Sequence, residues 1–285
     1  MTPQTTRFSS WEDAVHWLRA QPDRQGLVRD GYYDDPLIDA AERYRGSDEW
    51  QAIRAWLPAQ RGTALDVGAG RGIASYALAR EGFRVSALEP DPSALVGARA
   101  IESLARDARL PIEVTREFSE RLPFPDASFD VVFARAVLHH TRDLAAACRE
   151  FQRVLKPGGR LIAVREHVIS RREDLPAFLA IHPLHALYGG ENAFLLAEYQ
   201  AALDAAGLRT RAVLAPLDSP VNLAPHTPQT FCRELTRRTL SQWPPLAAAV
   251  AGILALPPVW AVARRVLRLV DHRPGRLYSF IAEPA

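Results

Sequence analysis

Three glycines lie between a short apolar run and a helix-forming stretch in the segment LDVGAGRGIASYALA, residues 65–79. Gly68, Gly70 and Gly72 can take the backbone conformations of a tight turn, and such a turn brings main-chain N–H groups close to a nucleotide. The dinucleotide fingerprint G-x-G-x-x-G is not completed, because Ile73 stands where its last glycine would be. The segment also lacks the lysine with which a P-loop binds phosphate. The pattern therefore argues against a bound dinucleotide or nucleoside triphosphate.

Two carboxylates accompany this glycine-rich turn. Asp66 directly precedes the glycines, where a negative charge suits a cationic ligand better than a pyrophosphate. Glu89 ends the next apolar run, and an acidic residue at that place accepts hydrogen bonds from the hydroxyls of a ribose. A positively charged nucleoside without phosphates meets these requirements. The residues thus predict S-adenosylmethionine (SAM) as the cofactor.

Four segments, taken in order, resemble class I SAM-dependent methyltransferases, in the broad branch that includes quinone-biosynthesis enzymes. They lie between about residues 63 and 207 and read LDVGAGRG, EPDPS, LPFPDASFDVVFARAVLHH and REFQRVLKPGGRLIAV. The resemblance implies a methyltransferase that binds SAM along the ends of its first strands. The residues that it assigns to the cofactor are Asp66, Gly68, Ala69, Gly70, Glu89, Pro90, Phe118, Ser119 and Arg135.

Within this set, Asp66 and the glycines would hold the methionine end of SAM, and Glu89 the ribose. Relatives commonly carry an Asp–Ala pair beside the adenine, where this chain has Phe118 and Ser119. A phenyl ring there can stack on the base, and a hydroxyl can bond to it. Arg135 follows the fourth predicted strand, where its guanidinium can pair with the SAM carboxylate or with a carboxylate of a neighbouring helix.

Histidines follow the fourth and fifth predicted strands and recur in the segment IHPLHALYGGENAF, residues 181–194. An imidazole is a suitable general base where the methyl acceptor must lose a proton. Our candidates for the catalytic residues are His167, His182 and His185 as the base and Tyr188 as a group that orients the acceptor.

The same residues also have structural interpretations. His139 and His140 are explained by helix packing or a local hydrogen bond, and Glu191 with Asn192 can cap the helix that follows them. Metal-binding side chains are present, but their spacing alone does not direct them to one point. These side chains are Glu166, His167, His182 and His185. We therefore expect no bound metal.

Alternating strands and helices position these residues. Short apolar runs predict strands and amphipathic stretches predict helices between them, the arrangement of a doubly wound parallel sheet. The strands are expected at residues 63–67, 84–89, 112–116, 129–134, 160–167, 209–215 and 276–283, and the helices at 73–81, from Asp91 with Pro92 in the first turn, at 143–156 and at 191–206. We expect an α/β fold with a Rossmann-like sheet of seven strands, the last of them antiparallel. Such sheets bind ligands beyond the carboxyl ends of their strands.

Two regions lie outside this alternation and are expected to cover the binding edge. The predicted division is a helical N-terminal cap at 1–60, with a helix that begins after Ser47, a SAM-binding core at 61–215, a helical lid insertion at 216–275 and the last strand at 276–285.

The composition is ordinary for a globular protein of 285 residues, with 48% hydrophobic residues and a net charge of +2. So small a charge predicts no nucleic-acid partner, and the segment after the fourth strand lacks the Asn/Asp-Pro-Pro-aromatic motif of enzymes that methylate nucleobase amines. Cys148 and Cys232 are isolated, which predicts neither a disulfide framework nor a cysteine zinc site. The first residues read as an amphipathic helix instead of a signal peptide, so we expect a cytoplasmic protein.

One segment without charge, residues 246–263, just reaches the length of a transmembrane helix. Pro257 and Pro258 interrupt it, so two short buried helices are expected. The alternative is peripheral membrane contact through residues 246–270, where arginines follow the apolar residues.

The expected function is methyl transfer from SAM to a small-molecule or lipid-linked acceptor. Two alternatives stay open. The first is a cyclase or lyase that acts on the aminobutyrate chain of SAM itself, and the second is a non-catalytic scaffold with a SAM-binding fold. The oligomeric state and the acceptor atom cannot be read from the sequence pattern.

Overall fold

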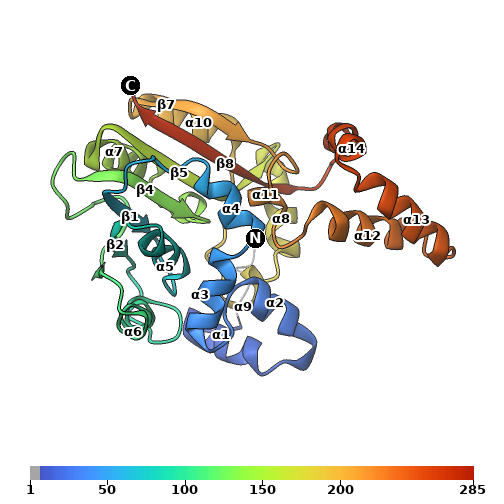
Figure 1. Cartoon of the computed structure of the whole chain (residues 1–285), viewed down its shortest axis with the longest axis horizontal. Helices are drawn as coiled ribbons and strands as arrows, with labels where there is room; N and C mark the ends of the chain where they lie inside the picture. The colour runs from blue at the N-terminus through green and yellow to red at the C-terminus, as the bar shows by residue number, and fades with distance from the viewer. Residues whose placement is uncertain (1–6) are drawn as a thin grey trace.

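The computed structural model describes residues 7–285, and its centre is one sheet flanked by helices (Figure 1). The strands are β1 Thr63–Val67, β2 Arg84–Leu88, β3 Ile112–Thr115, β4 Phe129–Arg135, β5 Leu155–Ile169, β6 Phe194–Leu195, β7 Leu208–Leu214 and β8 Gly275–Pro284. They follow the order β3-β2-β1-β4-β5-β8-β7, with β6 paired to β5. All pairings are parallel except those of β8, which is antiparallel to β5 and β7. The expected Rossmann-like sheet with an antiparallel last strand is confirmed, and the two-residue β6 is an addition to it.

Helices cover the sheet and form two extensions. The helices that pack on the sheet and its neighbours are α3 Leu37–Arg45, α4 Asp48–Arg54, α5 Ile73–Arg80, α6 Ala98–Ala108, α7 Leu144–Val154 and α10 Leu196–Ala205. The others are α1 Trp11–Arg19, α2 Gln25–Asp30, α8 Leu175–Ile181, α9 His185–Tyr188, α11 Pro220–Leu223, α12 Pro228–Thr239, α13 Pro244–Leu254 and α14 Pro257–Leu269, with 3₁₀ turns at Pro22–Arg24, Leu138–His140 and Arg172–Asp174.

Strand β4 shows why the sheet is buried on both faces. Val131 and Phe133 join the core that α4 and α5 cover, whereas Val132 and Ala134 join the core that α7 and α10 cover. Successive side chains of a strand point to opposite faces, so a continuous apolar run fills both cores. The polar ends of the strands are therefore left to line the carboxyl edge of the sheet.

Two helices begin where the sequence predicts them. The hydroxyl of Ser47 accepts a hydrogen bond from the N–H of Trp50 at the start of α4 (3.1 Å), and the carboxylate of Asp143 accepts one from the N–H of Ala146 at the start of α7 (2.8 Å). Such caps satisfy main-chain donors that a first helical turn leaves unpaired, and each stabilises its helix by about 1 kcal/mol.

Two other predicted helix starts are wrong. The Asp91 carboxylate accepts a hydrogen bond from the N–H of Ser93 (2.8 Å), and the Asp91 carbonyl accepts one from Ala98 (2.7 Å), so α6 begins only at Ala98. Helix α10 begins at Leu196, and Glu191 is not its cap. The Asp91 carboxylate thus interacts with a turn before the helix, and the Glu191 carboxylate lies near histidines from other segments.

Helix α9 packs against the N-terminal helix α1. Leu187 of α9 shares an apolar cluster with Ala14 and Leu18 of α1. The ring centroids of Trp11 and Tyr188 are 6.1 Å apart. This contact holds the histidine-rich segment between α8 and β6 beneath the N-terminal helices.

Helices α12, α13 and α14, which we call the C-terminal arm, extend away from the sheet (Figure 1). The expected pair of short helices is confirmed, and α13 and α14 meet at a bend of 100°. The expectation that they are buried is wrong, because α14 has no buried residue and α13 has only Ala247 and Ala251. The large apolar side chains exposed along or beside the arm are Trp243, Leu246, Ile253, Leu256, Val262, Val266, Leu269 and Val270.

In the described part of the chain, no single helix has both the length and the apolar character needed to cross a membrane. The bent pair α13–α14 meets these criteria only when its two helices are taken together.

Candidate active site

The glycine-rich turn connects β1 to α5 through left-handed backbone. Gly68, Gly70 and Gly72 have φ angles of +59°, +54° and +82°, a region that strongly favours glycine. A Cβ atom at Gly68 would lie 2.8 Å from the side chain of Val137, and one at Gly72 would lie 3.0 Å from that of Ile101. A Cβ atom at Gly70 would meet nothing within 4 Å. The middle of the turn thus presents bare backbone to open space.

Glu89 follows β2 and faces the same turn. Its two carboxylate oxygens accept hydrogen bonds from the N–H groups of Gly70 (2.7 Å) and Asp91 (2.9 Å). Burial raises the pKa of Glu89 to about 7, although these two bonds act in the opposite direction. An ionised carboxylate has about four acceptor positions, so two remain for other donors.

Asp66 lies beneath the turn, at the end of β1. Its carboxylate accepts a short hydrogen bond from the hydroxyl of Ser75 (2.6 Å), and burial raises its pKa to about 7. The N–H of Ala69 donates to the carbonyl of Leu88 (3.0 Å), which ties the turn to β2. Asp66 therefore joins the end of β1 to α5 through the hydroxyl of Ser75.

These residues fit SAM. The open space at Gly70 is a cradle that any side chain would fill. Glu89 offers acceptors to hydroxyl donors and Asp66 offers a negative charge to a cation, and both groups lie at the carboxyl ends of neighbouring parallel strands. Pro90 follows Glu89 and is half-buried.

The residues predicted to contact the adenine lie beyond the end of β3. The ring of Phe118 is 54% exposed, and the guanidinium of Arg142 lies 5.6 Å from its centroid. The hydroxyl of Ser119 donates to the carboxylate of Glu120 (3.1 Å), and Ser119 itself is buried. The exposed ring leaves a surface for stacking, and its contact with adenine stays a prediction.

Arg135 lies in a buried ion pair. It donates two hydrogen bonds to the carboxylate of Glu49 on α4 (2.6 and 3.1 Å), and Arg165 approaches the same carboxylate at 3.9 Å. Burial alone would lower the pKa of Arg135, but Glu49 raises it above its ordinary value. Of the two roles that the sequence leaves open for Arg135, the structure shows the pairing with a helix carboxylate. A second contact of Arg135 with SAM stays a prediction.

Four histidines surround Glu191, and we call these five residues the histidine cluster. They come from three separate segments: the turn after β4, strand β5 and the segment between α8 and β6. The distances are 3.6 Å from His139 Nε2, 3.8 Å from His140 Nε2 and 3.6 Å from His167 Nδ1 to Glu191 Oε2, and 3.8 Å from His182 Nδ1 to Glu191 Oε1. All four distances exceed that of a hydrogen bond.

Glu166, a fully buried carboxylate on β5, fixes one side of the cluster. It accepts hydrogen bonds from His139 Nδ1 (2.7 Å) and from the N–H groups of Val137 and His139 (3.1 Å each). The side chain of Val137 in turn packs on Gly68. Val137 therefore lies between the glycine-rich turn and the histidine cluster.

Burial and neighbouring charges give the imidazoles of the cluster very different pKa values. Burial, together with the charge of His139, lowers the pKa of His167 to about 2. Burial acts on His139 in the same direction, but Glu166 and Glu191 outweigh it and raise its pKa to about 9. His139, His140 and His182 hold the pKa of Glu191 at about 2 against the effect of burial. In the absence of a ligand, His139 and Glu191 are thus both charged.

The other two predicted catalytic residues lie on α9. His185 Nδ1 is buried and has no hydrogen-bond partner within residues 7–285. The side chain of Tyr188 is 40% exposed, beside Trp11. His185 lies three residues after His182 in the sequence, but it is not one of the four histidines whose ring nitrogens lie 3.6–3.8 Å from the Glu191 carboxylate.

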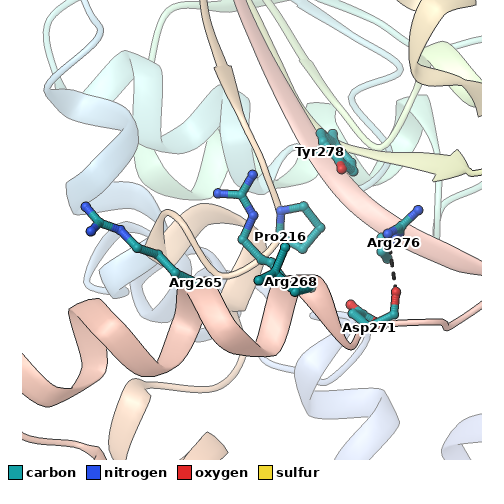
Figure 2. A pocket seen from close by; sticks show the side chains of 7 residues that line it. Pro216, Arg265, Arg268, Asp271, Arg276 and Tyr278 are labelled. Atoms are coloured by element: carbon teal, nitrogen blue, oxygen red, sulfur yellow. Dashed lines mark hydrogen bonds between the residues drawn. The ribbon is translucent and has the colours of Figure 1, made fainter.

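A separate cavity of about 340 Å³ lies between α14 and β8 (Figure 2). The residues that line it are Pro216, Arg265, Arg268, Leu269, Asp271, Arg276 and Tyr278. Arg276 donates to the carbonyl of Asp271 (3.5 Å), as Figure 2 shows, and Arg268 is paired with Asp218 (2.8 Å). No residue of the glycine-rich turn or of the histidine cluster lines this cavity, so it is not the SAM site.

The sequence pattern does not identify Glu191 as the centre of the histidine cluster. Glu191 has the residue type and position of a helix cap, and only the late start of α10 shows that it has another role. His139 and Glu166 were visible as polar residues at strand ends, a signal that favours a site but does not select partners.

Comparisons with known proteins show similarity to methyltransferases. A model of a methyltransferase domain matches residues 65–163. The chain is 31% identical over 203 residues to a ubiquinone biosynthesis O-methyltransferase of Methylobacterium nodulans, which covers 68% of this chain and 77% of that relative. It is 49% identical over 53 residues to the uncharacterized protein YafE of Escherichia coli, and this match spans 19% of the chain and only 26% of that relative.

Solved structures show the same fold. The geranyl diphosphate C-methyltransferase from Streptomyces coelicolor, in complex with Mg²⁺, geranyl diphosphate and S-adenosyl-L-homocysteine, matches with a TM-score of 0.59. The match covers 99% of this chain and 100% of that chain at 16% identity. At that identity the likeness concerns the fold.

Proposed function

Because the chain belongs to the class I SAM-dependent methyltransferases, in their quinone-biosynthesis-like branch, we propose that it methylates a small-molecule or lipid-linked acceptor held at the histidine cluster. The observation that carries this proposal is the position of Val137, which packs on Gly68 and donates its N–H to Glu166 (3.1 Å). A donor at the turn and an acceptor at the cluster would lie about one residue layer apart. Such proximity is the main requirement of a displacement between two bound molecules.

SAM carries a methyl group on a sulfonium sulfur. A nucleophile attacks the methyl carbon in line with the carbon–sulfur bond, and the sulfur leaves as the thioether of S-adenosylhomocysteine. The protein has to align the reactants and exclude water. In our proposal the Glu89 carboxylate accepts hydrogen bonds from the ribose hydroxyls. The bare backbone around Gly70, together with Asp66, holds the methionine end of SAM. Helices α1 and α9 close the acceptor side against solvent, as the packing of Leu187 on α1 supports.

A proton acceptor is needed where the nucleophile carries a proton. We assign this role to His182 or His185. His167 is less suited to hold a proton, since burial lowers its pKa to about 2, far below the working pH of a general base. Tyr188, at the end of α9, would orient the acceptor.

An acceptor with an apolar part agrees with the surface of the arm. One structural relative is named for geranyl diphosphate, which joins an apolar chain to a charged group. Ile253 on α13, Leu256 between the two helices and Val266 on α14 are each more than half exposed. Arginines lie on α14, as in helices that bind a membrane surface. We propose that residues 246–270 contact a membrane from which a lipid-linked acceptor is taken.

Product analysis tests the reaction. The chain is incubated with SAM that carries a deuterated methyl group and with a panel of phenols, quinols and isoprenoid compounds, and the mixture is read by mass spectrometry. We expect S-adenosylhomocysteine in equal amount to a labelled acceptor. Methylthioadenosine would instead indicate attack within the aminobutyrate chain of SAM, and bound SAM without turnover would favour a scaffold.

Variants test the assignment of the base. His182→Ala or His185→Ala is expected to lower kcat by about 10²–10⁴-fold while the affinity for SAM stays unchanged. The matched control is His272→Ala, because His272 is exposed and lies after the arm. Full activity in both cluster-side variants would remove these histidines from the chemistry.

A further inference from the structure

We propose that the histidine cluster is a binding site for one divalent first-row transition-metal ion, with His139, His167 and Glu191 as ligands and His182 beside them. The ligand atoms that these three residues can offer all lie within 4.8 Å of one another. Two imidazoles and one carboxylate form a donor set that zinc and iron sites use. The binding of the ion does not depend on the proposed function.

The distances match the edges of a metal coordination shell better than those of hydrogen bonds. His139 Nε2 and His167 Nδ1 each lie 3.6 Å from Glu191 Oε2. Two ligands at 2.0–2.1 Å from a tetrahedral ion are about 3.4 Å apart, as follows from the usual Zn–N and Zn–O lengths. A shift of a few tenths of an ångström would therefore bring these atoms around one ion.

Several of these atoms are buried without a partner. His167 Nδ1, His182 Nδ1 and Glu191 Oε2 accept or donate no hydrogen bond within residues 7–285. Buried polar atoms are normally satisfied, and unpaired ones point to a missing water or ion. Here three such atoms converge on one place, and His182 Nδ1 lies 3.8 Å from Glu191 Oε1.

The outer sides of the imidazoles are fixed as in metal sites. His139 Nδ1 is bonded to the Glu166 carboxylate (2.7 Å), and His140 Nδ1 to the carbonyl of Gly190 (2.9 Å). Such bonds orient the opposite ring nitrogen toward a metal and increase its basicity. For both residues that opposite nitrogen, Nε2, is the atom that faces Glu191.

The ion would also have a chemical use, and this part of the inference rests on the proposed function. A metal-bound hydroxyl or phenol loses its proton at a lower pH than the free group. An acceptor oxygen bound to the ion would thus lose its proton to His182, His185 or solvent, and would then attack the methyl carbon as an oxyanion. The acceptor class that fits is an alcohol or phenol.

Metal titration tests the site. The full chain is stripped with a chelator and titrated with Zn²⁺ in the presence of a chromophoric competitor, and Co²⁺ serves as the optical probe of geometry. We expect one equivalent to bind, and the Co²⁺ form to show the intense visible bands of a four- or five-coordinate ion. A lack of saturation at one equivalent, or a Co²⁺ spectrum of the hydrated octahedral ion, would overturn the proposal.

Three variants locate the binding. Glu191→Gln keeps the shape but removes the central charge, and it should weaken Zn²⁺ binding more than Glu166→Gln, for which we expect a loss of about 10–100-fold as for other outer partners of metal ligands. His272→Ala is the control, with unchanged Zn²⁺ affinity. Unchanged affinity in Glu191→Gln would show that Glu191 only balances the charge of His139.

A parallel titration with SAM separates this proposal from the function. Each variant should bind SAM as the unaltered chain does, because Glu89 and the glycine-rich turn are intact. Loss of Zn²⁺ with SAM binding retained locates the metal at the cluster. If SAM fails to bind the unaltered chain but Zn²⁺ binds, the proposed function fails while the metal site stands.

Discussion

At the scale of single residues, buried carboxylates at the sheet edge fall into two groups. Glu89 and Asp66 are hydrogen-bonded to neutral donors, so burial dominates and raises the pKa of each to about 7. Glu49 and Glu191 are surrounded by guanidinium or imidazole groups, which lower the pKa of each despite burial. The environment thus keeps the first pair available to a ligand and holds the second pair in charged networks.

Binding of S-adenosylhomocysteine should depend on the ionisation of Glu89. The ribose hydroxyls donate to the carboxylate, and its pKa is raised to about 7, so affinity should increase about tenfold between about pH 6 and about pH 8. Calorimetric titrations across this range measure the effect. Glu89→Gln, which cannot ionise, should bind more weakly at high pH and show a flatter profile. An equally steep profile in Glu89→Gln would assign the ionisation to another group.

Without ligand the same group acts on stability in the opposite direction. Folding raises the pKa of Glu89 from 4.5 to about 7, so the folded chain favours the protonated form. Its contribution is fully present below about pH 4.5 and is lost as the pH rises through about 7. The difference in unfolding free energy between the unaltered chain and Glu89→Gln should change with this sign across that range.

The ion pair of Glu49 with Arg135 should be costly to break. The Glu49 side chain is 1% exposed, and its removal in Glu49→Ala leaves Arg135 and Arg165 without their carboxylate. We expect a loss of about 3–5 kcal/mol in unfolding free energy, as for other buried pairs from which one partner is removed. Urea denaturation measures it, with Asp23→Ala as the exposed control at less than about 0.5 kcal/mol. Equal losses in both variants would contradict the account.

At the scale of elements, β1, the glycine-rich turn and α5 together position the proposed SAM site. Strand β1 ends at Val67, α5 begins at Ile73, and the turn between them leaves Gly70 open to a ligand. The turn is close to both neighbours: Gly68 packs on Val137 and Gly72 packs on Ile101 of α6. The glycines therefore serve two purposes, since two of them allow packing and one allows binding.

Substitution within the turn should separate these purposes. Gly72→Ala places a Cβ atom 3.0 Å from Ile101 at a φ of +82°, and we expect a loss of stability of about 1–3 kcal/mol. Gly252→Ala, in α13 with nothing within 4 Å of the new atom, should be neutral or stabilising by about 0.5–1 kcal/mol. Thermal or urea unfolding of both variants measures the contrast. A neutral Gly72→Ala would mean that the turn relaxes without cost.

At the scale of the whole molecule, the sequence predicted the sheet well because its signals are local. The apolar runs of β1 and β4 and the glycines after β1 define strand positions and the SAM turn without reference to distant residues. The histidine cluster is different, because Glu191 meets His139 and His167 only when three segments fold together. The burial of the C-terminal arm was predicted wrongly for a related reason. An apolar helix is expected to be buried, and only the folded structure shows whether another element covers it.

Membrane contact by the arm is testable on vesicles. The charged substitutions Ile253→Glu and Val266→Glu fall on side chains that are 58% and 54% exposed, so they should leave folding intact. We expect the unaltered chain to sediment with vesicles of anionic lipid and the double variant to remain in solution. Ile181→Glu, at a 67% exposed site outside the arm, is the control. Equal sedimentation of all three chains would remove the arm from membrane binding.

The most direct test of the account is a crystal structure of the chain with S-adenosylhomocysteine. We predict the ribose hydroxyls on the carboxylate of Glu89, the homocysteine end over Gly70, and the sulfur facing the histidine cluster across Val137. A ligand bound in this way would place donor and acceptor on the two sides of the same residue. A sulfur that faces away from the cluster, or a ligand in another part of the molecule, would contradict the account.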